Sequence, residues 1–287
     1  MFSVFSVPSS DFALNRDLYL FYVVMAPPNA LCIVQSEISL LSTALKCNAR
    51  VSFRGYQEEI RSPIYKNFLQ LKSILDKLST LSEVEPLVYL APFLEVIRSE
   101  DITGPITGLA LTAVDKFLSY GLLELPFSEC GDLPSTGPGS LYSIAVAVEA
   151  IADSGTQARF VGTDRSSDEV VLMKVLHLLR TLLLVPAGSL VSDRVVREIL
   201  QSCFRICFEP KLSELLRRTA EMCLASIIQL FFSRLPSMLW DAQKTQATVN
   251  ADHNNPVSVL YRASLSSINS SVDMYISTFI SHRFIRY

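Results

Sequence analysis

The stretch SSDEVVLMKVLHLLRTLLLVP, residues 166–186, decides the fold. Its apolar side chains recur at steps of three and four residues, which is the period of an amphipathic α-helix. The serine and acidic residues at 166–169 predict a capping box at the helix start, and Pro186 predicts its end. The stretch therefore predicts a helix over 170–185 whose buried face is formed by Leu172, Val175, Leu176, Leu179 and Leu183.

The same periodicity recurs on both sides of this stretch, between residues 31 and 236. Pro92 is placed to begin one helix, Thr103 is placed to cap the next, which Gly121 ends, and Pro236 is placed to end the last. Short turns between amphipathic helices favour an all-α, armadillo/HEAT-like α-solenoid of antiparallel helix pairs, although no exact sequence repeat is present. The eight predicted helices cover 31–45, 65–78, 92–98, 103–121, 141–158, 170–185, 192–207 and 212–235, with no strand.

The two ends of the chain differ from this central region. Residues 1–28 are predicted to be a nonstandard leader, 29–239 the helical domain, and 240–287 a nonstandard, disordered tail rich in Ser, Asn, Gln and Thr. Within the tail, 272–280 alternates like a strand that has no evident partner. No stretch approaches 18 consecutive apolar residues, so no transmembrane helix is expected.

Composition excludes several functions. With a net charge of −3, the chain lacks the basic footprint of a nucleic-acid-binding protein. The densest basic group, Arg217-Arg218, has Glu214 and Glu221 one turn away and is predicted to be a neutralised helix surface. The six cysteines lie mostly within apolar helical patterns, which is typical of a reduced intracellular protein.

No catalytic or metal-binding motif is present. His177 lies in the apolar stretch above with no nucleophile placed beside it, so a core or boundary histidine is expected. Cys203 and Cys207 share one helix face, but a metal needs three or four ligands, so core packing is expected. The segment 104–108 opens a helix with glycines but contains no lysine, which favours a plain helix start over an anion site. We therefore expect no catalytic residue, no metal and no cofactor.

Four segments carry a resemblance to a known family. They are 32–50 (CIVQSEISLLSTALKCNAR), 93–120 (FLEVIRSEDITGPITGLALTAVDKFLSY), 158–184 (ARFVGTDRSSDEVVLMKVLHLLRTLLL) and 201–216 (QSCFRICFEPKLSELL). Together they resemble the N-terminal dimerisation and cyclophilin-binding domain of the Golgi-specific brefeldin A-resistance, GBF/GNOM-type, large Arf guanine-nucleotide exchange factors. The resemblance covers about residues 31–236, and neither end of the chain resembles the family.

The resemblance implies a non-catalytic regulatory module in vesicle trafficking. Such a domain is an armadillo-like solenoid that self-associates, contacts the downstream homology domain and helps to control recruitment to membranes. The expected location is the cytoplasm, peripheral to Golgi membranes, and cyclophilin-type or small-GTPase regulators are further candidate partners. The family's catalytic F-R-[IL]-P-G-E motif is absent, because the chain contains no Gly-Glu dipeptide, so it is expected not to be an enzyme.

The family's dimer contacts map onto Lys116 and Glu169, as the resemblance implies. Each residue also has an ordinary alternative role: Lys116 complements a helix dipole, and Glu169 closes a capping box. Two other functions stay open: an enzyme whose site escapes motif analysis, and a generic armadillo-like adaptor that binds peptides along a groove.

Overall fold

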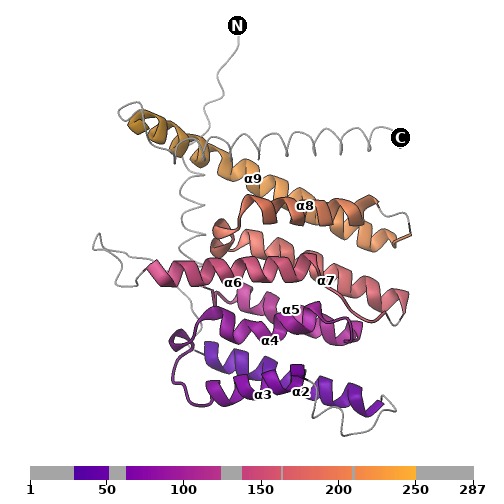
Figure 1. Ribbon diagram of the computed structural model, residues 1–287. Coiled ribbons are helices and arrows are strands. Elements are labelled where there is room, and N and C mark those ends of the chain that lie inside the picture. Colours follow the sequence, from indigo (N-terminus) through magenta and orange to yellow (C-terminus); the bar gives the residue numbers. More distant parts are fainter. Residues whose placement is uncertain (1–28, 52–62, 124–137, 163, 209–210, 250–287) are drawn as a thin grey trace.

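The computed structural model describes residues 29–51, 63–123, 138–162, 164–208 and 211–249 (Figure 1). In this part of the chain there are eight α-helices and no β-strand, only a single bridge between Thr103 and Val161. The all-α prediction is confirmed. The helices are α2 (Ala30–Val51), α3 (Pro63–Leu75), α4 (Pro86–Arg98), α5 (Gly104–Ser119), α6 (Pro138–Thr156), α7 (Arg165–Leu184), α8 (Asp193–Phe208) and α9 (Glu214–Val249), with short 3-10 helices η1 (Leu81–Glu83) and η2 (Pro186–Leu190).

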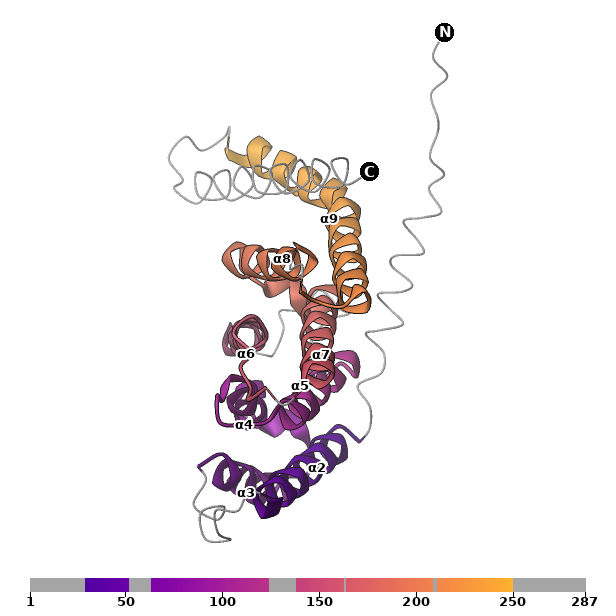
Figure 2. The same ribbon diagram turned by 90° about the vertical axis from the view of Figure 1, so that its right-hand side faces the viewer.

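The helices form two layers (Figure 2). Helices α3, α4, α6 and α8 stack on one another in one layer, and α2, α5, α7 and α9 stack in the other. Each pair of consecutive helices, from α2/α3 to α8/α9, spans the two layers, and only the first pair crosses them in the opposite order. This is the predicted α-solenoid of antiparallel pairs, in which each repeat contacts mainly its neighbours.

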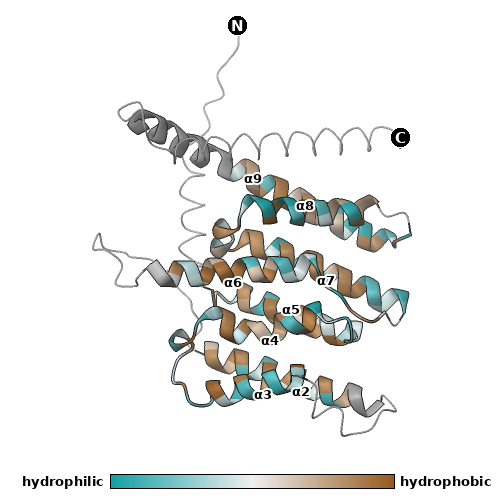
Figure 3. Ribbon diagram, viewed as in Figure 1, coloured by the Kyte–Doolittle hydropathy of each residue, from teal (hydrophilic) through white to brown (hydrophobic). Residues whose placement is uncertain are grey.

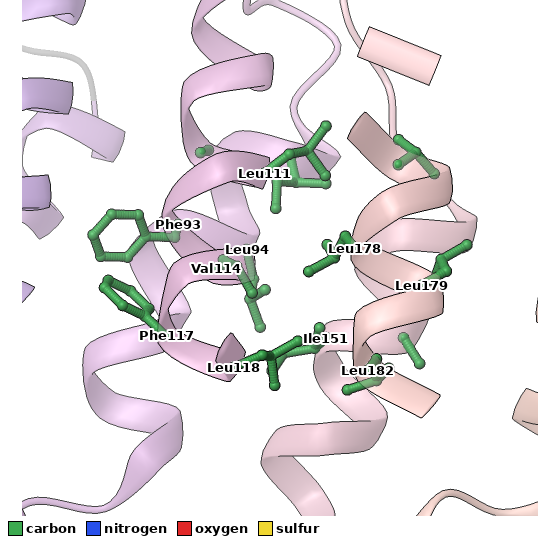
Figure 4. Close-up of a cluster of buried hydrophobic side chains, with 14 of the residues drawn as sticks. Phe93, Leu94, Leu111, Val114, Phe117, Leu118, Ile151, Leu178, Leu179 and Leu182 are labelled. Atoms are coloured by element: carbon green, nitrogen blue, oxygen red, sulfur yellow. The ribbon is translucent and has the colours of Figure 1, made fainter. Parts of the chain in front are cut away.

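The core lies between the layers. Hydrophobic and hydrophilic residues alternate around each helix (Figure 3), so each helix buries an apolar face on its neighbours. Leu111 and Leu118 of α5 face Leu178 and Leu182 of α7 (Figure 4), and all four are at most 2% exposed. The rings of Phe68, Phe93 and Phe117 pack edge to face, at centroid distances of 5.1 and 5.2 Å, and join α3, α4 and α5.

Helix α5 begins and ends as predicted. Its N-cap is Thr103 and Pro105 lies in its first turn. At the other end Gly121 has a φ of 69°, a conformation that favours glycine, and the N–H groups of Gly121 and Leu122 donate to the carbonyls of Leu118 and Phe117. These two hydrogen bonds form a Schellman motif, which fixes the C-terminal end of α5.

Two predictions about prolines are wrong. Helix α4 begins at Pro86, and Pro92 lies inside it, buried beside Leu90 and Phe93. Helix α9 does not end at Pro236 but continues to Val249. An interior proline removes one main-chain hydrogen bond and kinks the helix, and burial of apolar neighbours can outweigh that cost. Figure 2 shows that α9 changes direction along its length.

Helix α9 runs past position 240, where the tail is predicted to begin. Likewise α6 begins at Pro138, inside the loop at 122–140 that the predicted helices 103–121 and 141–158 leave between them. Residues 1–28, the rest of that loop at 124–137, the remaining tail at 250–287 and the strand-like stretch at 272–280 lie outside the described residues. The predictions made for them stay predictions.

The start of α7 also differs from the expected capping box. Its N-cap is Asp164, whose carboxylate accepts a hydrogen bond from the main-chain N–H of Ser167 at 3.1 Å. Asp164 takes the N-cap position in place of Ser166, because a charged carboxylate accepts a stronger hydrogen bond from the main-chain N–H than a hydroxyl does. Glu169 is therefore released from capping its own helix and makes other contacts.

One described helix, α2, contains a stretch long and apolar enough to cross a membrane by length and composition, at 30–47. The expectation of no such helix rested on an unbroken apolar run, and this stretch is interrupted by polar residues. Val34, Ile38 and Leu41 of α2 are at most 1% exposed, against α3 and α5. A core helix of a soluble protein passes the same test, and this packing makes α2 part of the solenoid.

Candidate interaction surface

Lys116 lies in the last turn of α5 and forms an ion pair with Glu37 of α2. Its Nζ lies 2.6 Å from Oε1 of Glu37. The Lys116 side chain is 40% exposed, whereas the Glu37 side chain is 8% exposed. Lys116 therefore ties the first helix pair to the second, and it still presents part of its side chain to solvent.

Glu37 is a residue that sequence reasoning missed. It shares the face of α2 that carries Val34, Ile38 and Leu41, all buried. Among the described residues, its second oxygen, Oε2, is buried without a hydrogen-bond partner. A carboxylate on an otherwise apolar stripe was the available signal, because a buried charge needs a partner.

Glu169 joins α7 to the start of α9. Its Oε1 accepts the main-chain N–H of Ser213 at 3.0 Å and the Nε of Arg165 at 3.3 Å. Hydrogen bonding to the Ser213 side chain is the largest cause that lowers the pKa of Glu169, and the Ser213 main-chain N–H and Arg165 add smaller effects. Ser213 directly precedes α9, so Glu169 places a negative charge at the N-terminus of that helix, which the helix dipole favours.

Lys116 and Glu169 lie far apart on the layer formed by α2, α5, α7 and α9, which we call the outer layer. Helices α5 and α7 run side by side, and the Lys174 ammonium of α7 donates to the Gly108 carbonyl of α5 at 3.1 Å. With that register and a rise of 1.5 Å per residue, Glu169 and Lys116 are roughly 20 Å apart along the helices. They cannot pair within one chain.

Between them the surface of α5 and α7 is mixed in character. The His177 Nε2 lies 3.6 Å from Asp115 Oδ2, and the His177 side chain is 60% exposed. His177 therefore lies at the boundary of the fold, one of the two placements that the sequence predicted. Apolar side chains on the same layer are also exposed: Val170 by 45%, Leu215 by 65% and Met222 by 66%.

The remaining candidates take structural roles in the described part of the chain. Cys203 and Cys207 are buried in the core, and no group of three or more potential metal ligands occurs among the described residues. Gly104 is buried at the start of α5, where an added Cβ would lie 3.3 Å from side-chain atoms of Phe160 and Val171, a tight contact. Arg217 pairs with Glu214 at 3.3 Å, as the spacing predicted.

Comparison with known proteins identifies the class. No family model matches the chain. Over 226 residues, 77% of this chain, it is 40% identical to the Golgi-specific brefeldin A-resistance guanine nucleotide exchange factor 1 homolog of Caenorhabditis elegans. It is 28% identical to the ARF guanine-nucleotide exchange factor GNOM of Arabidopsis thaliana over 76% of the chain, and 30% identical to ARF guanine-nucleotide exchange factor 2 of Saccharomyces cerevisiae over 61%.

The helical solenoid is thus related by sequence to the large Arf guanine-nucleotide exchange factors of the Golgi-specific brefeldin A-resistance and GNOM type. The resemblance inferred from the four segments is confirmed. The matched region makes up 10% of the Caenorhabditis relative and 14% of GNOM, so the chain spans about a tenth of the length of these relatives.

Proposed function

We propose that this chain is a non-catalytic regulatory module of a Golgi Arf exchange factor, which self-associates and helps to control recruitment to the membrane. The observation that carries the proposal is the 40% identity over 77% of the chain to a Golgi-specific exchange factor, of which the match spans 10%. The match is too short to include a whole exchange factor, and the chain has no Gly-Glu dipeptide for the family's catalytic motif.

The proposed location is the cytoplasmic side of Golgi membranes, with peripheral attachment. The proposed partners are a second copy of this chain and the downstream homology domain of the full-length exchange factor. Cyclophilin-type or small-GTPase regulators are further candidates. In support of a protein partner, the outer layer exposes Leu215, Met222 and Val170, large apolar side chains of the kind that bind other proteins.

The outer layer of α5 and α7 suits a two-fold dimer. In such a dimer every contact appears twice, because residue i of one copy meets residue j of the other and the reverse. Lys116 and Glu169 lie roughly 20 Å apart on parallel helices. A two-fold axis midway between them would bring Lys116 of each copy to Glu169 of the other.

Both residues already have partners within the chain, and this sets the design of the experiment. Lys116→Glu removes the partner of Glu37 as well as any contact across the dimer. Glu169→Lys removes the contact with Ser213 at the start of α9. A loss of dimer in either single variant would therefore not distinguish the two roles.

Two double variants distinguish them. Lys116→Glu with Glu169→Lys restores a pair across the dimer, whereas Lys116→Glu with Glu37→Lys restores the pair within the chain. Size-exclusion chromatography with light scattering gives the mass, and circular dichroism gives the helicity. We expect a wild-type dimer at micromolar concentration, weaker dimers for the single variants, and recovery in the first double variant alone.

Three outcomes contradict the proposal in different ways. A wild-type monomer at all concentrations refutes self-association and favours the peptide-binding adaptor. Recovery of the dimer only with Glu37→Lys shows that the effect of Lys116 on the dimer is indirect, through the docking of α2. Measurable nucleotide exchange on Arf by the chain alone would contradict the non-catalytic assignment.

A further inference from the structure

Two buried thiols face each other where α8 meets α9. The Sγ atoms of Cys203 and Cys223 are 3.9 Å apart, and the two residues are 0% and 3% exposed. The Sγ of Cys223 also lies 3.4 Å from the carbonyl oxygen of Leu176 on α7. The pair therefore lies at the junction of three helices, and no local pattern predicts it, because Cys203 and Cys223 are twenty residues apart on different helices.

The surroundings make the two sulfurs unequal. The hydrogen bond between the two thiols is the largest cause that lowers the pKa of Cys223; burial opposes it, and the positive charge of Arg180 adds to the lowering. The same hydrogen bond and burial raise the pKa of Cys203. The Nε of Arg180 is buried without a hydrogen-bond partner among the described residues, so no hydrogen bond of that atom competes with its attraction to Cys223. Of the two sulfurs, Cys223 therefore loses its proton more readily, and Cys203 retains it more strongly.

We propose that Cys203 and Cys223 form a redox-active dithiol, which peroxide converts into a disulfide joining α8 to α9. The Cys223 thiolate attacks one oxygen of hydrogen peroxide and the O–O bond breaks. Hydroxide leaves, takes up a proton and becomes water, and Cys223 carries a sulfenic acid. The Cys203 sulfur then attacks the sulfenic sulfur, the S–O bond breaks, and a second water leaves with the thiol proton. Two thiols are oxidised and one peroxide is reduced to two waters.

The fold permits this reaction with small movements. A disulfide requires a sulfur separation of about 2.05 Å, so the gap must shorten by roughly 2 Å. Helices α8 and α9 are consecutive, so a small shift of one helix on the other closes the gap between the sulfurs. Local opening of this helix pair admits peroxide to the thiols.

The disulfide would restrict how α9 moves on α8. Helix α9 carries the most exposed apolar side chains of the outer layer, Leu215 and Met222. Oxidation would therefore hold that surface in one position relative to the rest of the solenoid. This inference rests on the thiol geometry and does not depend on the proposed dimer.

Cys207 supplies a matched control. It lies one helical turn after Cys203, it is also buried at 6% exposure, and burial raises its pKa to about 12. It lies on the same helix as Cys203 and is also buried, but no hydrogen bond joins its sulfur to another thiol among the described residues. If burial alone decided reactivity, Cys203 and Cys207 would react alike.

The test treats the full, reduced and folded chain with hydrogen peroxide, then blocks free thiols with N-ethylmaleimide and maps the peptides by mass spectrometry. We expect a Cys203–Cys223 disulfide at a yield at least about tenfold above any other pair. Cys207→Ala should leave that yield unchanged. Cys203→Ala should abolish it and leave a sulfenic acid on Cys223 that dimedone traps.

Other outcomes overturn the proposal. The thiols could stay reduced while the chain is folded and become cross-linked only in urea, or Cys207 could be cross-linked as readily as Cys203. Short peroxide exposures of the wild-type chain with dimedone present give a second measurement that needs no variant. Dimedone labelling of Cys203 in place of Cys223 would overturn the order of the two steps, and labelling of neither would overturn the reaction.

Discussion

Replacing Lys116 with methionine should destabilise the fold through a residue on another helix. Methionine keeps the apolar length of lysine but removes the ammonium that lies 2.6 Å from Glu37. The Glu37 carboxylate, 8% exposed, would then be buried without that partner, while its other oxygen already has none among the described residues. Breaking a fully buried pair costs about 3–5 kcal/mol, and breaking an exposed pair costs at most about 1 kcal/mol.

The exposure of Lys116 places this pair between those limits. Because its side chain is 40% exposed and water screens part of the attraction, we expect a loss of about 2–3 kcal/mol. For a domain of this size each kcal/mol lowers the melting temperature by about 2–4 °C, so the shift should be roughly 4–12 °C. The loss falls mainly on the docking of α2 against α5.

The reverse substitution should cost less. Glu37→Met leaves the Lys116 ammonium, which can turn toward water, so we expect a loss below about 1 kcal/mol. The double variant should come within about 1 kcal/mol of the wild type, because an apolar pair can replace a buried ion pair without loss. This asymmetry follows from the unequal burial of the two side chains.

The assay is urea unfolding followed by circular dichroism at 222 nm, at two protein concentrations, which show whether dimerisation contributes to the free energy of unfolding of each variant. Circular dichroism before unfolding confirms that each variant is helical. The reasoning is refuted if Lys116→Met costs less than about 0.5 kcal/mol, or if Glu37→Met costs as much as Lys116→Met.

Three further predictions concern the core, the close packing of helices and the cap of α7. Phe117→Ala should cost about 3–5 kcal/mol in urea unfolding, because its ring is fully buried between two other aromatic rings, whereas Leu40→Ala, at 47% exposure, should change stability by less than about 0.5 kcal/mol. Gly188→Ala should disrupt folding, because its Cβ would lie 2.2 Å from a main-chain carbonyl oxygen. Gly108→Ala meets only the end of a lysine side chain, so its melting temperature should stay within a few degrees of the wild type. Equal melting temperatures for the two variants would contradict the packing described. Hydrogen bonds from Ser166 and Ser167 lower the pKa of Asp164 to about 2, so its stabilising effect is present above the usual value of 3.8 and is lost as pH falls toward 2. Asp164→Ala should therefore make the urea midpoint less dependent on pH over that range. An unchanged dependence on pH would show that another carboxylate is responsible.

The helices could be predicted from the sequence wherever residues close together in the chain decide where a helix begins, ends and buries its face. The stripe of α7 is an example, because Val175, Leu176, Leu179 and Leu183 are buried as the spacing predicted. The ends of α5 were also local, fixed by Thr103 and by Gly121. The count of eight helices and their arrangement in a solenoid follow from the same local signals.

The errors arose where residues distant in the sequence decide the outcome. Pro92 predicted a helix start because its missing N–H is best tolerated there. In the structure the burial of Leu90 and Phe93, against helices that no local window contains, keeps α4 continuous across it. Pro236 likewise predicted a helix end, whereas α9 continues past it to Val249.

The candidate site could be predicted only in part for the same reason. Lys116 and Glu37 are 79 residues apart, and Glu169 and Ser213 are 44 residues apart. Nothing in the local pattern indicates these contacts, although a glutamate on the apolar stripe of α2 indicated that some partner was needed. The resemblance pointed to Lys116 and Glu169 without indicating that each also joins two helix pairs.

In the proposed dimer, these contacts would connect stability and association in one surface. Lys116 holds α2 against α5, and Glu169 holds the start of α9 against α7, so the two residues secure both ends of the outer layer. If copies of the chain associate through that layer, each residue would contact the partner while it still supports its own solenoid. A partner's opposite charge would then add to a geometry that is already fixed, which lowers the ordering cost of binding. Substitutions at Lys116 and Glu169 should consequently change association and stability together, whereas those at exposed His177 should leave stability unchanged and report on association alone.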